Sequence, residues 1–242
     1  MSLLATAAPS NVAVVGFVTL VTVVTVAIVG LVPIASQRAG DNQRVAARRT
    51  ATVAISLAGW LALTWLVAAS GILEQFDRRP PPLLLLVGSS LILSTVVAFS
   101  RFGLLLARSL PTAMLVGIHV FRLPLELILY QLSFDGVLPV QMTFDGMNYD
   151  ILTGILAAAV ALWASWYEPP RAVLLMWNLL GLFLLLVIMT IAMLSAPLPI
   201  RLFPNDPANA IVATAPFVWL PTVLVQVAWI GHLLVFRRLR RR

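Results

Sequence analysis

Seven apolar segments dominate this chain of 242 residues, and each is close to the ~20 residues that an α-helix needs to cross ~30 Å of hydrocarbon. The chain is 61% hydrophobic and 10% charged, whereas soluble domains average about 45–50% apolar and about 25% charged residues. This pattern predicts an all-α polytopic membrane protein, a bundle of seven transmembrane helices that forms a single transmembrane domain over residues 1–242. The segments lie at about 12–35, 50–73, 82–100, 111–134, 149–167, 172–195 and 212–236.

The distribution of arginine predicts the orientation of these helices. The chain has 16 basic residues, all arginine, against nine acidic residues, and its net charge is +7. The loop 135–150 carries three aspartates and no arginine. The positive-inside rule therefore predicts an outer N-terminus and a cytoplasmic C-terminus in a prokaryotic cytoplasmic (inner) membrane. The clustered arginines are Arg38, Arg44, Arg48, Arg49, Arg101 and Arg108, followed by the Arg-rich cytoplasmic tail 237–242.

Composition also narrows the class of function and of partner. Short basic runs beside apolar spans predict contact with the lipid bilayer, with anionic lipid headgroups at the tail, and no nucleic acid. The absence of cysteine excludes disulfides, thiolate metal sites and a cysteine nucleophile. The absence of lysine excludes a retinal Schiff base, and no phosphate-binding glycine loop or hydrolase motif is present. An enzymatic activity is therefore the less favoured interpretation, and no catalytic residue is predicted.

One apolar segment, 111–134, carries a stripe of ionisable side chains. On an α-helix His119, Arg122 and Glu126 lie within about 60° of one another, and Tyr130 continues the line. Burying such a charge at a helix centre costs roughly 2.5–3.5 kcal/mol on insertion scales, so these residues predict a functional site. Arg122 and Glu126 are spaced to pair within the helix, and Pro124 leaves a backbone carbonyl free beside them. Together they predict a polar intramembrane pocket.

Other polar residues are candidates for the same ligand or proton site. The outer loop 135–150 is rich in turn formers and acids, and it contributes Asp145, Asn148 and Asp150. Asn148 or Asp145 is suited to cap the next helix, with Asp150 in its first turn. Alternatively, the loop forms a lid whose carboxylates face the pocket. Asn178, in segment 172–195, is either part of the site or a hydrogen-bonding group between helices.

The two histidines suggest a second kind of site. His119 and His232 lie on different predicted helices in the same half of the membrane. Two such imidazoles can ligate a haem or a metal ion between them. Apart from haem bound by these two histidines, which is kept as an alternative, no cofactor is predicted.

The C-terminal half of the chain resembles a known family. The shared pattern covers about residues 105–236, and its motifs include Arg122, Glu126 and Gln131, then 139–154, 177–178, 195–197, 217–221 and His232. It resembles a family of uncharacterised bacterial seven-helix integral membrane proteins. The resemblance implies location and fold, and it suggests that the outer loop acts together with the fourth and seventh helices.

These observations lead to one functional expectation and two alternatives. We expect an integral membrane protein whose pocket at His119, Arg122 and Glu126 receives a small solute, a lipid or a proton, in transport or in sensing. The first alternative is a membrane redox protein that binds haem or metal through His119 and His232. The second is a structural subunit of a larger complex, with a membrane protein partner or a second copy of the chain, in which the stripe only fixes helix packing.

Overall fold

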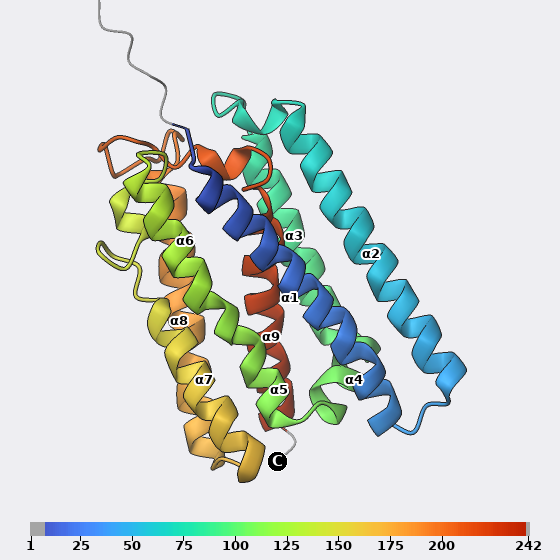
Figure 1. Ribbon diagram of the computed structural model, residues 1–242. Coiled ribbons are helices and arrows are strands. Elements are labelled where there is room, and N and C mark those ends of the chain that lie inside the picture. The colour runs from blue at the N-terminus through green and yellow to red at the C-terminus, as the bar shows by residue number, and fades with distance from the viewer. Residues whose placement is uncertain (1–7, 241–242) are drawn as a thin grey trace, which may run out of the picture.

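The computed structural model describes residues 8–240, and within them the chain is helical with no strand (Figure 1). Residues 1–7 and the last two arginines of the predicted tail, 241–242, lie outside the described residues. The α-helices are α1 Asn11–Arg38, α2 Gln43–Ala69, α3 Pro82–Phe99, α4 Arg101–Ser109, α5 Thr112–Gly117, α6 Arg122–Phe134, α7 Ile151–Trp166, α8 Arg171–Ser195 and α9 Val225–Leu239. Short turns of 3₁₀-helix are η1 Ile72–Glu74, η2 Ile118–Phe121, η3 Val140–Met142 and η4 Ile211–Ala213, and a π-helical turn, η5, spans Leu220–Leu224.

The starts of the helices follow from local sequence. Ser10 caps α1 by accepting the Ala13 N–H through its hydroxyl at 3.3 Å. The Asn42 side chain accepts the N–H of Val45 at 2.9 Å in the same way at α2. Such caps satisfy backbone donors that have no partner within the helix.

Six helical stretches in the described chain are long and apolar enough to cross a membrane. They are Asn11–Arg38, Gln43–Ala69, Pro82–Phe99, Thr112–Phe134, Arg171–Ser195 and Leu220–Leu239, and they correspond to six of the seven predicted segments. The remaining predicted segment, 149–167, forms α7, whose 16 residues span only ~24 Å at 1.5 Å per residue. The number of spanning helices and their orientation stay predictions.

Three details differ from the predicted segments. The second helix begins at Gln43 and ends at Ala69, earlier at both ends than the predicted 50–73, because Asn42 caps it ahead of the apolar run. The amphipathic helix α4 occupies 101–109, which the sequence assigned to a loop, and Ser100 caps it. The last helix begins with the π-turn at Leu220, eight residues after the predicted start at 212, because 3₁₀ and irregular turns occupy the residues before it.

The stretch Thr112–Phe134 is not one regular α-helix. It consists of α5, the 3₁₀ turn η2 and α6 in succession. Pro124 cannot donate to the carbonyl of Val120, and the tighter 3₁₀ turn ends directly before α6. The irregular turn contains His119 and ends beside Arg122.

The two ends of the bundle differ in charge. Near the C-terminus, Arg237 donates to the carbonyls of Ala98 and Ser100, and Arg238 donates to that of Leu110. The end of α9 therefore lies beside the end of α3 and beside α4, which carries Arg101 and Arg108. Figure 1 shows α4 and the end of α9 at the lower end of the bundle. This pairing also satisfies the last carbonyls of α3 and α4.

At the opposite end, the start of α1 is held to the end of α6. The backbone N–H of Ser10 donates to the carboxylate of Asp135 at 2.8 Å, and Gln131 donates to the other carboxylate oxygen at 2.8 Å. Desolvation raises the pKa of Asp135, but the hydrogen bonds from Ser10 and Gln131 together lower it further, and the pKa lies below its usual range. Asp135 is therefore an ionised anchor between two helices.

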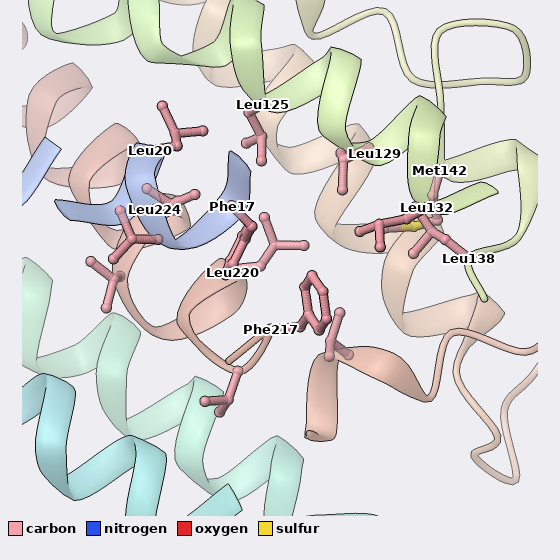
Figure 2. Packing of buried hydrophobic residues seen from close by; sticks show 14 of the residues in the cluster. Phe17, Leu20, Leu125, Leu129, Leu132, Leu138, Met142, Phe217, Leu220 and Leu224 are labelled. Atoms are coloured by element: carbon pink, nitrogen blue, oxygen red, sulfur yellow. The ribbon is translucent and has the colours of Figure 1, made fainter. Parts of the chain in front are cut away.

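The apolar core has two parts, which pack toward opposite ends of the bundle. One includes Phe17 and Phe217, whose ring centroids are 5.1 Å apart, with leucines of α6 and of the π-turn around them (Figure 2). The other joins α5, α7, α8 and the end of α9, and includes Val116, Trp177 and Leu234. Buried polar side chains, described below, occupy the layer between the two parts.

The segment between α6 and α7 turns back into the bundle. Arg122 lies twelve residues before the end of α6 at Phe134, which is ~18 Å along the helix axis. Asp150, at the start of α7, nevertheless forms an ion pair with Arg122. The chain therefore returns to the depth of Arg122 before α7 begins, and α7 packs against α5 and η2 (Figure 1).

Candidate functional site

Seven buried polar side chains meet in the layer between the two apolar cores. Each is at most 5% exposed. They come from η2, α6, the segment before α7, α8 and α9, and we call them the polar cluster. Its members are His119, Arg122, Glu126, Asn148, Asp150, Asn178 and His232.

Arg122 pairs with Asp150 and not with Glu126. Its Nη1 donates to Asp150 Oδ1, and Thr153 donates its hydroxyl to the same oxygen at 3.1 Å. The sequence predicted a pair between Arg122 and Glu126 on one helix, but the returning segment brings a different carboxylate to the guanidinium. A buried charge requires such a partner, because an unpaired charge in an apolar interior is costly.

Glu126 is held by an amide. The Asn148 side chain donates to Glu126 Oε1 at 2.7 Å and to Oε2 at 2.8 Å, and also to the Met142 carbonyl at 3.0 Å. The Asn148 carbonyl oxygen accepts the backbone N–H of Asp150 at 3.1 Å. No basic side chain in the described chain forms an ion pair with Glu126. The cluster thus has two carboxyl groups and one guanidinium.

Asn178 fixes the tautomer of His232. Its amide nitrogen donates to the His232 backbone carbonyl at 3.2 Å, which orients its oxygen toward Nδ1 of the same residue at 2.9 Å. Because that oxygen can only accept, Nδ1 carries the proton. The other ring nitrogen, Nε2, lies 3.2 Å from Arg122 Nη2 and accepts from it. His232 is therefore a neutral imidazole that orients the guanidinium.

His119 has no hydrogen-bond partner in the described chain for either ring nitrogen. Its ring contacts that of His232, with centroids 4.3 Å apart, and meets Trp177 edge-on with centroids 5.1 Å apart. A Cβ added at Gly231 would lie 2.5 Å from His119 Nε2, and one at Gly181 would lie 2.6 Å from His232 Cε1. The two glycines therefore make room for the two imidazole rings.

This packing does not fit a metal or haem held between the two histidines. Ligation from opposite sides would require both imidazoles to aim a nitrogen at a common ion, at ~2.0 Å for zinc. Here the rings contact one another and His232 Nε2 faces Arg122. No group of three or more potential metal-ligating residues is found in the described chain either.

Two candidates from the sequence lie outside the cluster. Tyr130 is 41% exposed and stacks on Phe144, with ring centroids 5.0 Å apart. Asp145 is exposed on the loop. The other six candidates for a ligand or proton site belong to the cluster, and so does His232. Thr153, Trp177, Gly181 and Gly231 were not predicted as site residues. Thr153 and Trp177 lie within the family motifs 139–154 and 177–178, whereas nothing in the sequence marked the two glycines.

A cavity of about 510 Å³ lies against the cluster. It runs between α3 and α8, which both pack on α9, and α6 and the π-turn form its inner wall. Its walls are apolar over most of their area, and they include Leu125, Leu129, Leu220 and Leu224 (Figure 2). At the inner end the polar lining is Arg122, Glu126, Asn148 and Asp150. Such a volume is in the range of small-molecule pockets, ≈ 300–1,000 Å³.

The mouth of this cavity lies between α3 and α8. Leu186, Thr190 and Met193 on α8 line the cavity and are also exposed. Gly88, on α3, lines it too, and a Cβ added there would meet nothing within 4 Å. The opening therefore faces the side of the bundle and not one of its ends. We call this space the lateral cavity.

Comparison with known proteins identifies one family. The family model described as "Domain of unknown function (DUF8737)" matches residues 81–240. That range contains the whole polar cluster and every residue of the lateral cavity. No curated protein and no solved structure matches the chain.

Proposed function

The chain belongs to the family described as Domain of unknown function (DUF8737), and we propose that it is a multi-pass membrane protein that binds a small, membrane-soluble molecule in the lateral cavity. The binding serves transport or sensing of that molecule. We place the protein in a prokaryotic cytoplasmic membrane, with the arginine-rich end of the bundle on the cytoplasmic side. The segment 136–166 then crosses as a returning loop followed by the short helix α7.

The observation that carries the proposal is the position of the polar cluster at the inner end of an apolar cavity. Pockets for small molecules are mostly apolar, with a few convergent polar groups that fix orientation and specificity. Ionisable residues within membrane helices mark substrate paths and proton relays. Arg122, Glu126, Asn148 and Asp150 line the cavity while they remain tied to one another.

The lateral mouth supports access from the lipid phase. α3 and α8 flank it, and both belong to stretches long and apolar enough to cross a membrane. A molecule dissolved in the bilayer would pass between these helices without entering water. The π-turn at Leu220–Leu224 forms part of the inner wall, and π-turns within helices occur frequently at functional sites.

The experiment is to identify what the protein retains. Wild-type protein is purified into nanodiscs of one synthetic lipid, and small molecules extracted from it are quantified by mass spectrometry. In Gly88→Leu a side chain enters the cavity mouth, whereas Gly59→Leu adds the same side chain on α2, where a Cβ also meets nothing within 4 Å.

We expect a molecule retained by wild type and by Gly59→Leu, and reduced at least tenfold in Gly88→Leu. Equal retention by Gly88→Leu and wild type, or no retained molecule in either, would refute a binding function for the cavity.

A further inference from the structure

The charges at the inner end of the lateral cavity define the class of ligand. Arg122 contributes one positive charge, and the ion pair with Asp150 cancels it. Glu126 contributes a second carboxyl group. The Asn148 amide donates to it, and no basic side chain in the described chain forms an ion pair with it. His232 is neutral by its hydrogen bonds, and it accepts from the guanidinium. The cavity wall therefore has one carboxyl group in excess.

A buried carboxylate without a counter-charge is costly, and two species can remove that cost. One is a proton, which leaves a neutral carboxylic acid. The other is a positively charged ligand head beside Glu126. The rest of the cavity wall is apolar except for Thr190 and Asn209, so it suits an apolar body and not a hydrated ion.

Because an excess carboxyl group lies at the inner end of an apolar cavity, we propose that the lateral cavity binds a lipophilic organic cation, whose charge replaces a proton on Glu126. The inference rests on the proposed function and names its ligand class. When the cation binds, the carboxylic acid O–H of Glu126 releases its proton to the aqueous phase. The carboxylate that remains pairs with the cation, so the net charge of the site is the same before and after exchange.

The groups around Glu126 make this exchange specific to one carboxyl. The charged groups that act on Glu126 are Arg122, on the same helix, and Asp150, at the start of α7. The two histidines contact each other, and His232 accepts from Arg122. The cavity-lining residues of α3 and α8 are all non-ionisable within the described chain. Asp150 already accepts hydrogen bonds from Arg122 and Thr153. The Asn148 amide is neutral and donates to both oxygens of Glu126.

The probe is tetraphenylphosphonium, a permanent lipophilic cation that cannot itself carry a proton. Its binding to the full chain in nanodiscs is measured by equilibrium dialysis, together with the pH change on binding in weakly buffered solution. Tetraphenylborate, an anion of similar shape, is the matched probe for partition into the lipid and the apolar walls.

We expect saturable binding of tetraphenylphosphonium with release of up to one proton per cation. Glu126→Gln should weaken binding at least tenfold and abolish proton release, whereas Glu126→Asp, which keeps the carboxyl, should retain both. Gly88→Leu should weaken binding, and Gly59→Leu should not. Unfolding temperatures of all variants establish that loss of binding is not loss of fold.

Two results would overturn the inference. The first is tetraphenylborate binding as tightly as tetraphenylphosphonium at the cavity. The second is undiminished tetraphenylphosphonium binding in folded Glu126→Gln. In either case retention of a natural molecule that depends on Gly88 would leave the proposed function standing with another ligand class. If that retention also fails, both the ligand class and the proposed function are refuted.

Discussion

The ion pair between Arg122 and Asp150 predicts a strong energetic coupling between two residues that lie 28 positions apart in the sequence. The perturbation is a double-mutant cycle of Arg122→Met, Asp150→Leu and the combined variant. Removing one partner of a buried pair leaves an uncompensated charge and typically costs about 3–5 kcal/mol. Each single variant should therefore lose that much of the free energy of unfolding.

The combined variant should lose far less than the two single variants together. Replacement of both charges by apolar side chains leaves no unpaired ion. The remaining losses are the hydrogen bonds from Arg122 to His232 and from Thr153 to Asp150, about 1 kcal/mol each. Two independent effects would total about 6–10 kcal/mol, so a coupling energy of at least ~3 kcal/mol follows.

The assay is reversible unfolding in mixed micelles, with the free energy of unfolding obtained for each variant. The control is the cycle of Arg122→Met with Glu126→Leu, because Arg122 and Glu126 share a helix and form no ion pair. We expect a smaller coupling in this control cycle. Additive effects in the cycle with Asp150, or a larger coupling in the cycle with Glu126, would refute the assigned pairing.

Three further predictions concern the surroundings of the cluster. Gly231→Ala should destabilise the protein by about 1–3 kcal/mol through overpacking, since its Cβ would lie 2.5 Å from His119 Nε2. Adding His119→Ala should restore the unfolding temperature, and an unfolding temperature that stays low would contradict the packing described. Asn178→Leu leaves the ring N–H of His232 buried without an acceptor, so it should cost about 1–3 kcal/mol in chemical unfolding, and a neutral effect would contradict the assigned tautomer. The pKa of Asp135 is lowered in the folded state. The ionised carboxylate therefore stabilises the fold above the ordinary aspartate pKa of ~3.9, and this stabilisation is lost as the pH falls through the folded-state pKa. Melting temperatures of wild type and Asp135→Asn should differ at neutral pH and converge in acid, and a constant difference would argue against an ionised anchor.

Helical periodicity was sufficient to predict the polar stripe. His119, Arg122 and Glu126 lie on one side of a helical stretch because their spacing sets their direction whatever packs against them. The six long apolar stretches follow equally directly from hydropathy. Both results depend only on local sequence.

The partners of these residues depend on tertiary structure and could not be read from spacing. The pairing of Arg122 with Asp150 requires the segment after α6 to return into the bundle, and nothing local distinguishes such a segment from an exposed loop. For the same reason α7 has only 16 residues and is shorter than the predicted segment 149–167, since the segment before it is a returning loop within the bundle. Tyr130 continues the helical line, but it is half-exposed and stacks on Phe144 of the returning segment, outside the polar cluster.

The roles of the glycines became visible only in three dimensions. Gly181 and Gly231 are unremarkable in sequence, within long apolar helices. In the structure each lies against an imidazole ring that a side chain would displace. Their function depends on which helices are neighbours, and pairwise helix packing is not encoded in the hydropathy of either helix alone.

The central claim is that Glu126 presents a carboxyl group to the lateral cavity and that this group exchanges its proton for a cationic ligand that enters from the lipid phase. Dicyclohexylcarbodiimide tests it most directly, because this apolar reagent reaches carboxyl groups from within a bilayer and reacts with their protonated form. Protein in nanodiscs is treated with the reagent, and the modified residue is located by peptide mass spectrometry. The account predicts one adduct on Glu126, formed more slowly when tetraphenylphosphonium is present and absent from Gly88→Leu. An unmodified Glu126, or an adduct whose formation is indifferent to both the cation and the Gly88 substitution, would contradict it.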